Sequence, residues 1–90
     1  MKKINIWDND EKIGELFFDD KNKIVEIHFE KNKNEEYVEI IKIMVDRMIK
    51  RGYSELIFDE KNIRIKNADE NVVLAIKQEL FMNLGLIFIK

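Results

Sequence analysis

The sequence predicts a single α+β domain in which two helices cover one face of a β-sheet. In several short segments apolar residues alternate with polar ones, which is the period of a β-strand, and in two longer segments they recur every third or fourth residue, which is the period of a helix. The chain contains no proline. In chain order the elements read ββ-βαββαβ, and this mixture of hairpins and helical crossovers predicts a two-layer sandwich with a mixed sheet. The 90 residues are enough for one hydrophobic core, so residues 1–90 are expected to form one domain.

Three strands are expected before the first helix. They cover residues 3–7, 12–18 and 23–29. The turn-forming sequence DDKNK joins the second strand to the third and predicts a hairpin. Because strand side chains alternate, Glu26 and His28 share one face of the third strand and its apolar residues share the other.

Residues 35–51 are expected to form the first helix. Glu35 and Glu36 lie in its first turn and basic residues in its last, which matches the helix dipole. Gly52 is a natural C-terminal stop. The apolar stripe expected to face the core consists of Tyr37, Val38, Ile40, Ile41, Met44, Val45, Met48 and Ile49.

Two more strands and a second helix follow. The strands are expected at 54–58 and 62–66, on either side of the turn sequence DEKN. Asn67 and Glu70 have the spacing of a capping box, which predicts the start of the helix, and Gly85 ends it. Its buried stripe is expected to consist of Val72, Val73, Ile76, Leu80 and Leu84.

Residues 86–90 predict a closing strand that is short and strongly apolar. Such a strand must be central in the sheet or covered by a partner, because an exposed apolar edge invites association. Strands joined by a helix are expected to be parallel neighbours or to lie one strand apart. From the third strand onward, the order βαββαβ is also that of ferredoxin-like domains.

Composition excludes several classes of function. The net charge of −2 argues against a binder of nucleic-acid backbones, which normally carries a basic excess. No apolar run is long enough to span a membrane and the N-terminus is not a signal peptide, so a cytoplasmic protein without a membrane partner is expected. The chain has no cysteine, and the segment 8–14 fails the spacing of a calcium loop because Lys12 and Ile13 take ligand and glycine positions. No metal site is expected.

Several segments together resemble the C-terminal part of the GNAT superfamily of N-acetyltransferases. These are KIGELFF, KIVEIHF, DRMIKRGYSELIF and LFMNLGLIF, which cover most of residues 12–89. The extra strand at 62–66 departs from the family. If the relationship holds, a splayed parallel strand pair with a free helix N-terminus is expected near residues 28–37. A paired and filled junction there would instead favour the ferredoxin-like arrangement.

The resemblance implies an acetyl-CoA pyrophosphate loop at the start of the first helix. The family's spacing places it on NKNEEY, residues 32–37, so the candidate cofactor-binding residues are Asn34, Glu35, Glu36 and Tyr37. Glu35 and Tyr37 take the positions where the family uses glycine to let the backbone approach phosphate. We therefore expect no cofactor here; the alternative is acetyl-CoA bound through backbone amides.

The resemblance also suggests where catalytic groups would lie. Phe81 stands where the family often has a tyrosine acid, and it lacks the ionisable hydroxyl. Glu26 matches a general base on the strand before the first helix, with His28 beside it; the other interpretation of the two is a surface pair on the solvated sheet face. The sequence thus favours a non-catalytic acetyltransferase-like domain that regulates or inhibits by binding another protein or itself. A divergent acetyl-CoA-dependent N-acetyltransferase is the alternative.

Overall fold

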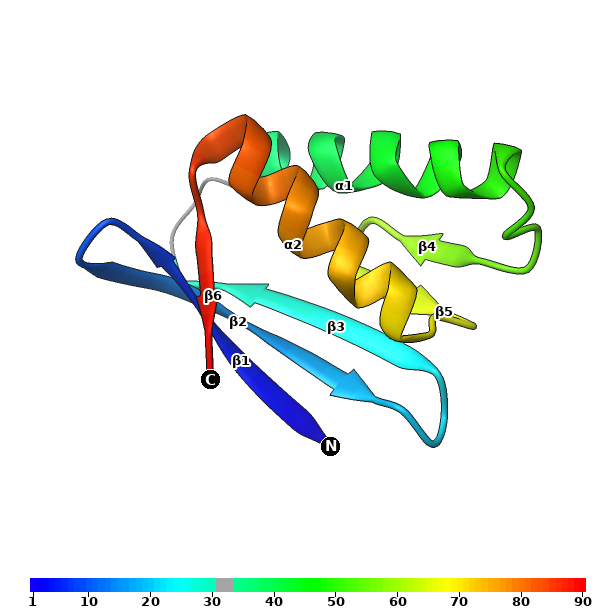
Figure 1. The fold of residues 1–90 in the computed structure, drawn as a ribbon, viewed down its shortest axis with the longest axis horizontal. Coiled ribbons are helices and arrows are strands. Elements are labelled where there is room, and N and C mark those ends of the chain that lie inside the picture. Colours follow the sequence, from blue (N-terminus) through cyan, green and yellow to red (C-terminus); the bar gives the residue numbers. More distant parts are fainter. Residues whose placement is uncertain (31–33) are drawn as a thin grey trace.

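The computed structural model describes residues 1–30 and 34–90 and has the predicted α+β architecture. The elements are β1 (Lys2–Asp8), β2 (Glu11–Asp19), β3 (Ile24–Phe29), α1 (Asn34–Lys50), β4 (Ile57–Asp59), β5 (Arg64–Lys66), α2 (Glu70–Leu84) and β6 (Ile87–Ile89). They follow the expected order ββ-βαββαβ. Both helices lie on the same face of the sheet, so the molecule has two layers (Figure 1).

The six strands form one sheet in the order β4-β5-β3-β2-β1-β6. The expected mixed sheet is wrong, because all five pairings between described strands are antiparallel. The strands joined by α1 lie one strand apart, as predicted, with β5 between β3 and β4. The strands joined by α2 do not: β5 and β6 are separated by β3, β2 and β1. The reason is that the N-terminal hairpin fills the space between β3 and β6.

The core lies between the sheet and the helices. Alternation points Val25 and Ile27 of β3 toward the helices, and both are buried. The buried residues of the two helices complete the core: Tyr37, Ile41, Met44 and Val45 from α1, and Val72, Val73, Ile76 and Leu80 from α2. All eight belong to the predicted apolar stripes, whereas Ile49 of the α1 stripe is exposed.

The strands β4 and β5 are shorter than predicted because turns occupy their expected beginnings. The backbone N–H of Leu56 donates to Tyr53 O at 3.2 Å, so the chain is still turning there. Ile63 has φ +46°, a left-handed conformation that a β-branched residue rarely adopts, and it cannot belong to a strand.

Two turns between strands of the sheet are stabilised by hydrogen bonds to an aspartate side chain. Asp19 accepts hydrogen bonds from the backbone of Lys21 and from the backbone and side chain of Asn22 at 2.7–3.1 Å. In the β4–β5 turn, Asp59 bonds the backbone of Lys61 and the side chain of Asn62 in the same way. The asparagine side chains are the main cause that lowers the pKa of both aspartates. The repeated sequence Asp-x-Lys-Asn therefore defines both turns.

The start of α2 differs from the predicted capping box. The N-cap is Asp69, whose side chain accepts hydrogen bonds from the backbone of Asn71 at 3.0 Å and of Val72 at 3.2 Å. Asn67 cannot cap because its side chain is turned away and donates to Glu55 O at 2.7 Å. The C-terminus agrees with the prediction, since Gly85 has φ +69° in a left-handed cap.

Replacing Asp69 with alanine is expected to destabilise the domain by about 1 kcal/mol, because two backbone N–H groups of α2 lose their acceptor. Equilibrium unfolding in urea, followed by circular dichroism, measures the loss. Asn71→Ala is the matched control, since it keeps both backbone donors and the cap. An equal loss in both variants would contradict the role of Asp69.

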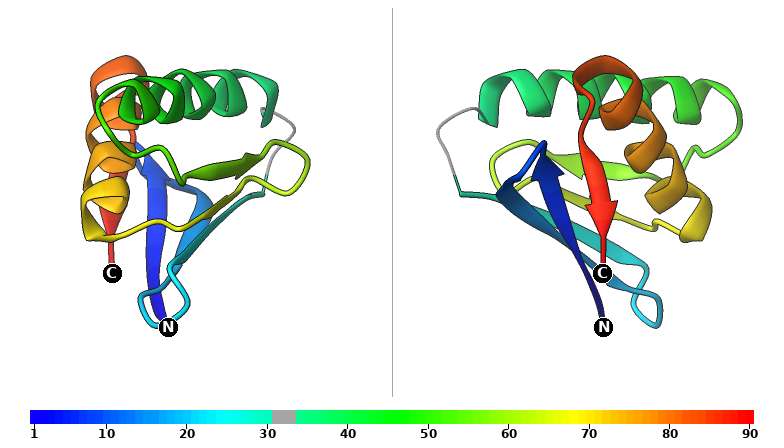
Figure 2. Two further views of the ribbon diagram at one scale, coloured as in Figure 1. Left: turned by 90° about the vertical axis from the view of Figure 1, so that its right-hand side faces the viewer. Right: turned by 60° about the vertical axis from the view of Figure 1, so that its left-hand side comes forward.

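The closing strand β6 is at an edge of the sheet. The expectation that it would be central is therefore wrong, and its other half, cover by a partner, stays a prediction. The sheet order explains the position: among the described strands, β6 pairs with β1 alone, through Asn5, Ile6 and Trp7. Figure 2 shows β6 beside β1, with α2 packed above this side of the sheet.

Candidate functional site

The face of the sheet that points away from the helices is the candidate site. Neither helix covers it (Figures 1 and 2). The pairing register brings side chains from four strands into rows across this face, because directly paired residues lie on the same side. We call it the open face and define it by Lys3, Trp7, Glu15, Phe17, Glu26, His28 and Arg64.

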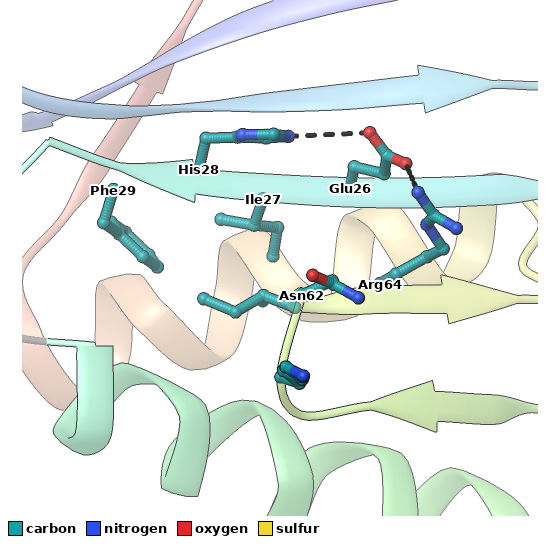
Figure 3. A pocket seen from close by; sticks show the side chains of 8 residues that line it. Glu26, Ile27, His28, Phe29, Asn62 and Arg64 are labelled. Atoms are coloured by element: carbon teal, nitrogen blue, oxygen red, sulfur yellow. Dashed lines mark ion pairs between the residues drawn. The ribbon is translucent and has the colours of Figure 1, made fainter.

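Glu26 is at the centre of a charged row on the open face. Its Oε1 lies 2.6 Å from a terminal nitrogen of Arg64, and its Oε2 lies 3.5 Å from His28 Nε2. Figure 3 shows the three side chains in line, with His28 and Glu26 projecting from β3 and Arg64 from β5. Glu26 and Arg64 are directly paired in the β3–β5 register, which explains their contact. The predicted pair of Glu26 and His28 is thus part of a three-residue row.

A second charged group and an aromatic contact complete the face. Glu15 lies 3.1 Å from the ammonium of Lys3 and 3.6 Å from that of Lys12. The hydrogen bond from Lys3 is the main cause that lowers the pKa of the Glu15 carboxyl, and the charge of Lys12 lowers it further. The ring of Phe17 meets His28 edge to face, with centroids 5.4 Å apart. Oppositely charged and aromatic side chains therefore lie side by side on the open face.

A hollow of about 300 Å³ lies beside this row, where β3 continues beyond the first residue of β5. Its lining includes Glu26, His28 and Arg64, together with Lys61 and Asn62 from the β4–β5 turn. The side chain of His28 is 61% exposed, so the hollow does not enclose it. Small-molecule sites usually bury most of the ligand surface, which this geometry does not do.

The predicted cofactor residues lie at the start of α1. Tyr37 is buried, and its ring packs against Phe29 of β3 with centroids 4.4 Å apart. Glu35 and Glu36 are exposed in the first helical turn. Asn34 begins the helix, and the rest of the expected loop, residues 32 and 33, lies outside the described residues. The described part of this segment thus has an aromatic pair and two exposed carboxylates at the start of α1, and neither group attracts an anion.

Other kinds of site find no support in the described chain. Among residues 1–30 and 34–90, no three histidine or acidic side chains come together as a metal site would require. Within the same residues, neither helix combines the length and apolar character needed to cross a membrane.

Sequence reasoning found Glu26 and His28 but missed Arg64 and Phe17. Alternation within one strand was enough to place Glu26 beside His28. The other two contacts depend on how β3 pairs with β5 and β2, which is a long-range property. The only sign of Arg64 in the sequence was an arginine on another predicted strand, at a position whose side chain could lie on the same face as Glu26.

No family model, curated protein or solved structure matches this chain.

Proposed function

We propose that this chain is a non-catalytic domain that binds another protein through the open face of its sheet. The observation that carries the proposal is the row of exposed His28 with half-buried Glu26 and Arg64, on a sheet face that no described element covers. Arg64 and Trp7 are of the residue types that dominate binding energy at protein interfaces. The charged side chains of the open face favour a partner of complementary charge and disfavour others.

The fold supports a binding role more than an acetyltransferase role. β5 lies between β3 and β4, so these two strands are not a splayed pair. The rings of Phe29 and Tyr37 pack together between the end of β3 and the start of α1. Both features are those expected of the ferredoxin-like arrangement, which is the layout we favour. The residual likeness to acetyltransferases then concerns element order and not a cofactor site.

A charge-swap variant tests the open face. In Glu26→Arg/Arg64→Glu the ion pair is retained with its partners exchanged, so the fold is preserved while the charge pattern of the face is reversed. The matched control is Lys42→Glu/Glu60→Lys, which exchanges an ion pair of 2.7 Å between α1 and the β4–β5 turn. Each protein is used to capture partners from an extract, and the affinity for a partner identified with the unmodified chain is then measured.

We expect the swap at Glu26 and Arg64 to weaken binding at least about tenfold, because like charges then face each other across the interface. The swap at Lys42 and Glu60 should leave binding unchanged. Equal binding by both variants would contradict the open face as the interface. Calorimetry with acetyl-CoA tests the other half of the proposal: we expect no binding, and micromolar affinity would favour the divergent acetyltransferase.

A further inference from the structure

The edge of the sheet formed by β6 has an apolar surface of its own. Ile87 and Ile89 are 44% and 55% exposed, and no charged residue lies between Gly85 and Lys90. Natural sheet edges usually carry charges, bulges or a covering element that prevents pairing with another strand. The opposite edge, β4, does carry Asp59, and Glu60 follows it. The β6 edge therefore lacks a protection that the β4 edge has.

The helix beside β6 adds exposed apolar residues on the helix side of the same edge, whereas Ile87 and Ile89 lie on the other side of the sheet, paired with Trp7 and Asn5. Leu74 and Phe81 of α2 are 53% and 59% exposed, and their spacing of seven residues places them on one helix face. A hollow between α2 and β6 is lined by Lys77, Gln78, Phe81, Leu86, Ile87 and Phe88. Figure 2 shows β6 running beneath α2 on this side of the molecule. We call Leu74, Phe81, Ile87, Phe88 and Ile89 the β6 edge surface.

The spacing of the exposed apolar residues on β6 and on α2 is compatible with a two-fold axis at this edge. Phe88 lies midway between the exposed Ile87 and Ile89. The point between Lys77 and Gln78 lies midway between the exposed Leu74 and Phe81. Lys77, Gln78 and Phe88 all line the hollow between α2 and β6, so the two midpoints lie beside the same hollow. A two-fold axis there would bring unlike apolar residues together on both elements at once.

The two ends of this edge also have opposite charges. Lys90 follows the end of β6, and among the described residues it has no ion pair. At the other end, Ile87 pairs with Trp7, so the strand begins beside the turn of residues 8–11, which contains three acidic residues. A two-fold axis at Phe88 places Lys90 of one copy beside Leu86 of the other, close to that acidic turn. The charges thus favour a second copy in antiparallel orientation.

We propose that this chain forms a homodimer in which the β6 strands of two copies pair antiparallel about Phe88. Ile87 of each copy then lies opposite Ile89 of the other, and Leu74 packs against Phe81 of the second α2. The two sheets become one continuous sheet, and each copy keeps its own open face. The seam lies on the same side of the sheet as the open face, because Ile87 and Ile89 pair with Trp7 and Asn5, but it does not include the row His28–Glu26–Arg64. The dimer therefore does not rest on the proposed function.

Sedimentation equilibrium over a range of concentrations tests the dimer. We expect the unmodified chain to reach twice its mass of 10.9 kDa. Ile89→Lys should raise the dissociation constant at least about tenfold, because it places a charge in the apolar seam. The matched control is Ile57→Lys on the β4 edge, where the side chain is equally exposed at 56%. A monomer at every concentration, or equal weakening by both variants, would overturn the proposal.

Disulfide crosslinking tests the register. The chain has no cysteine, so introduced thiols are the only ones present. In the double variant Ile87→Cys/Ile89→Cys, the thiol at position 87 of one copy lies opposite the thiol at position 89 of the other. Mild oxidation should therefore give a covalent dimer. In either single variant, like positions are diagonal neighbours about 7–8 Å apart, too far for a disulfide. Crosslinking that is equal in the single and double variants would contradict the axis at Phe88.

Discussion

Replacing Gly14 with alanine is expected to destabilise the domain by about 3 kcal/mol, at the upper end of overpacking costs. Gly14 is buried in β2 directly opposite Phe29 of β3. A Cβ atom at this position would lie 2.5 Å from His28 O, 2.9 Å from Phe29 Cδ1 and 3.2 Å from Phe29 Cα. Two of these atoms belong to the backbone and cannot move without opening the β2–β3 ladder. Urea unfolding at constant pH measures the loss.

The control for this substitution is Gly85→Ala. Gly85 has φ +69°, but apart from Gly85 itself and its two chain neighbours, no described residue has an atom within 4 Å of an added Cβ. Alanine there costs only the left-handed backbone conformation, about 1 kcal/mol. The two glycines thus separate steric overlap from backbone strain. Equal losses at the two positions would contradict the close approach at Gly14.

Gly14 also makes room for the ring of Phe29 at the end of β3. Because Gly14 has no side chain, the ring of Phe29 can lie over β2, where it meets Tyr37 at the start of α1. The small size of Gly14 in β2 therefore allows a ring contact between β3 and α1. The sequence contains no local sign of this, because Gly14 and Phe29 are brought together only by the β2–β3 register.

Local periodicity was enough to predict the order of elements and the buried stripes of both helices. It failed where a residue adopts an unusual conformation or bonds to a distant group. Ile63 is apolar and in phase with Ile65, yet its positive φ removes it from β5. Asn67 has cap spacing, yet its side chain bonds to Glu55 O. The sheet order was open for the same reason: inserting the β1–β2 hairpin between β3 and β6 depends on pairings across the whole chain.

The candidate site shows the same division between local and long-range information. Glu26 and His28 lie together because of alternation within β3, which the sequence alone predicts. Arg64 joins them only through the pairing of β3 with β5. Tyr37 belonged to two predictions, as part of the apolar helix stripe and as a cofactor-loop residue. Its burial against Phe29 agrees with the stripe.

Truncating Tyr37 to alanine is expected to cost about 3 kcal/mol of unfolding free energy, as for other buried aromatic side chains. The ring is buried and packs on Phe29, so its removal leaves a cavity at the start of α1. Tyr37→Phe is the matched control because it keeps the ring, and we expect it to lose less than about 1 kcal/mol. A loss below about 1 kcal/mol for the alanine variant would mean that the ring is not part of the core. The start of α1 would then be open to the cofactor interpretation.

The same position predicts a pH dependence. Burial is the main cause that raises the pKa of Tyr37 above its ordinary value of 10.0, and the charges of Asp8 and Glu36 raise it further. The folded state therefore holds the phenolic proton more tightly than the unfolded state does. The resulting stability is fully present below pH 10.0 and is lost as the pH rises through the pKa of the folded state. Between pH 10.0 and the pKa of the folded state, the urea midpoint of the unmodified chain should fall more steeply than that of Tyr37→Phe, which has no proton to lose. If the urea midpoints of the two proteins fall in parallel with pH, Tyr37 has the same pKa in the folded and unfolded states. That result would contradict its burial beside Phe29.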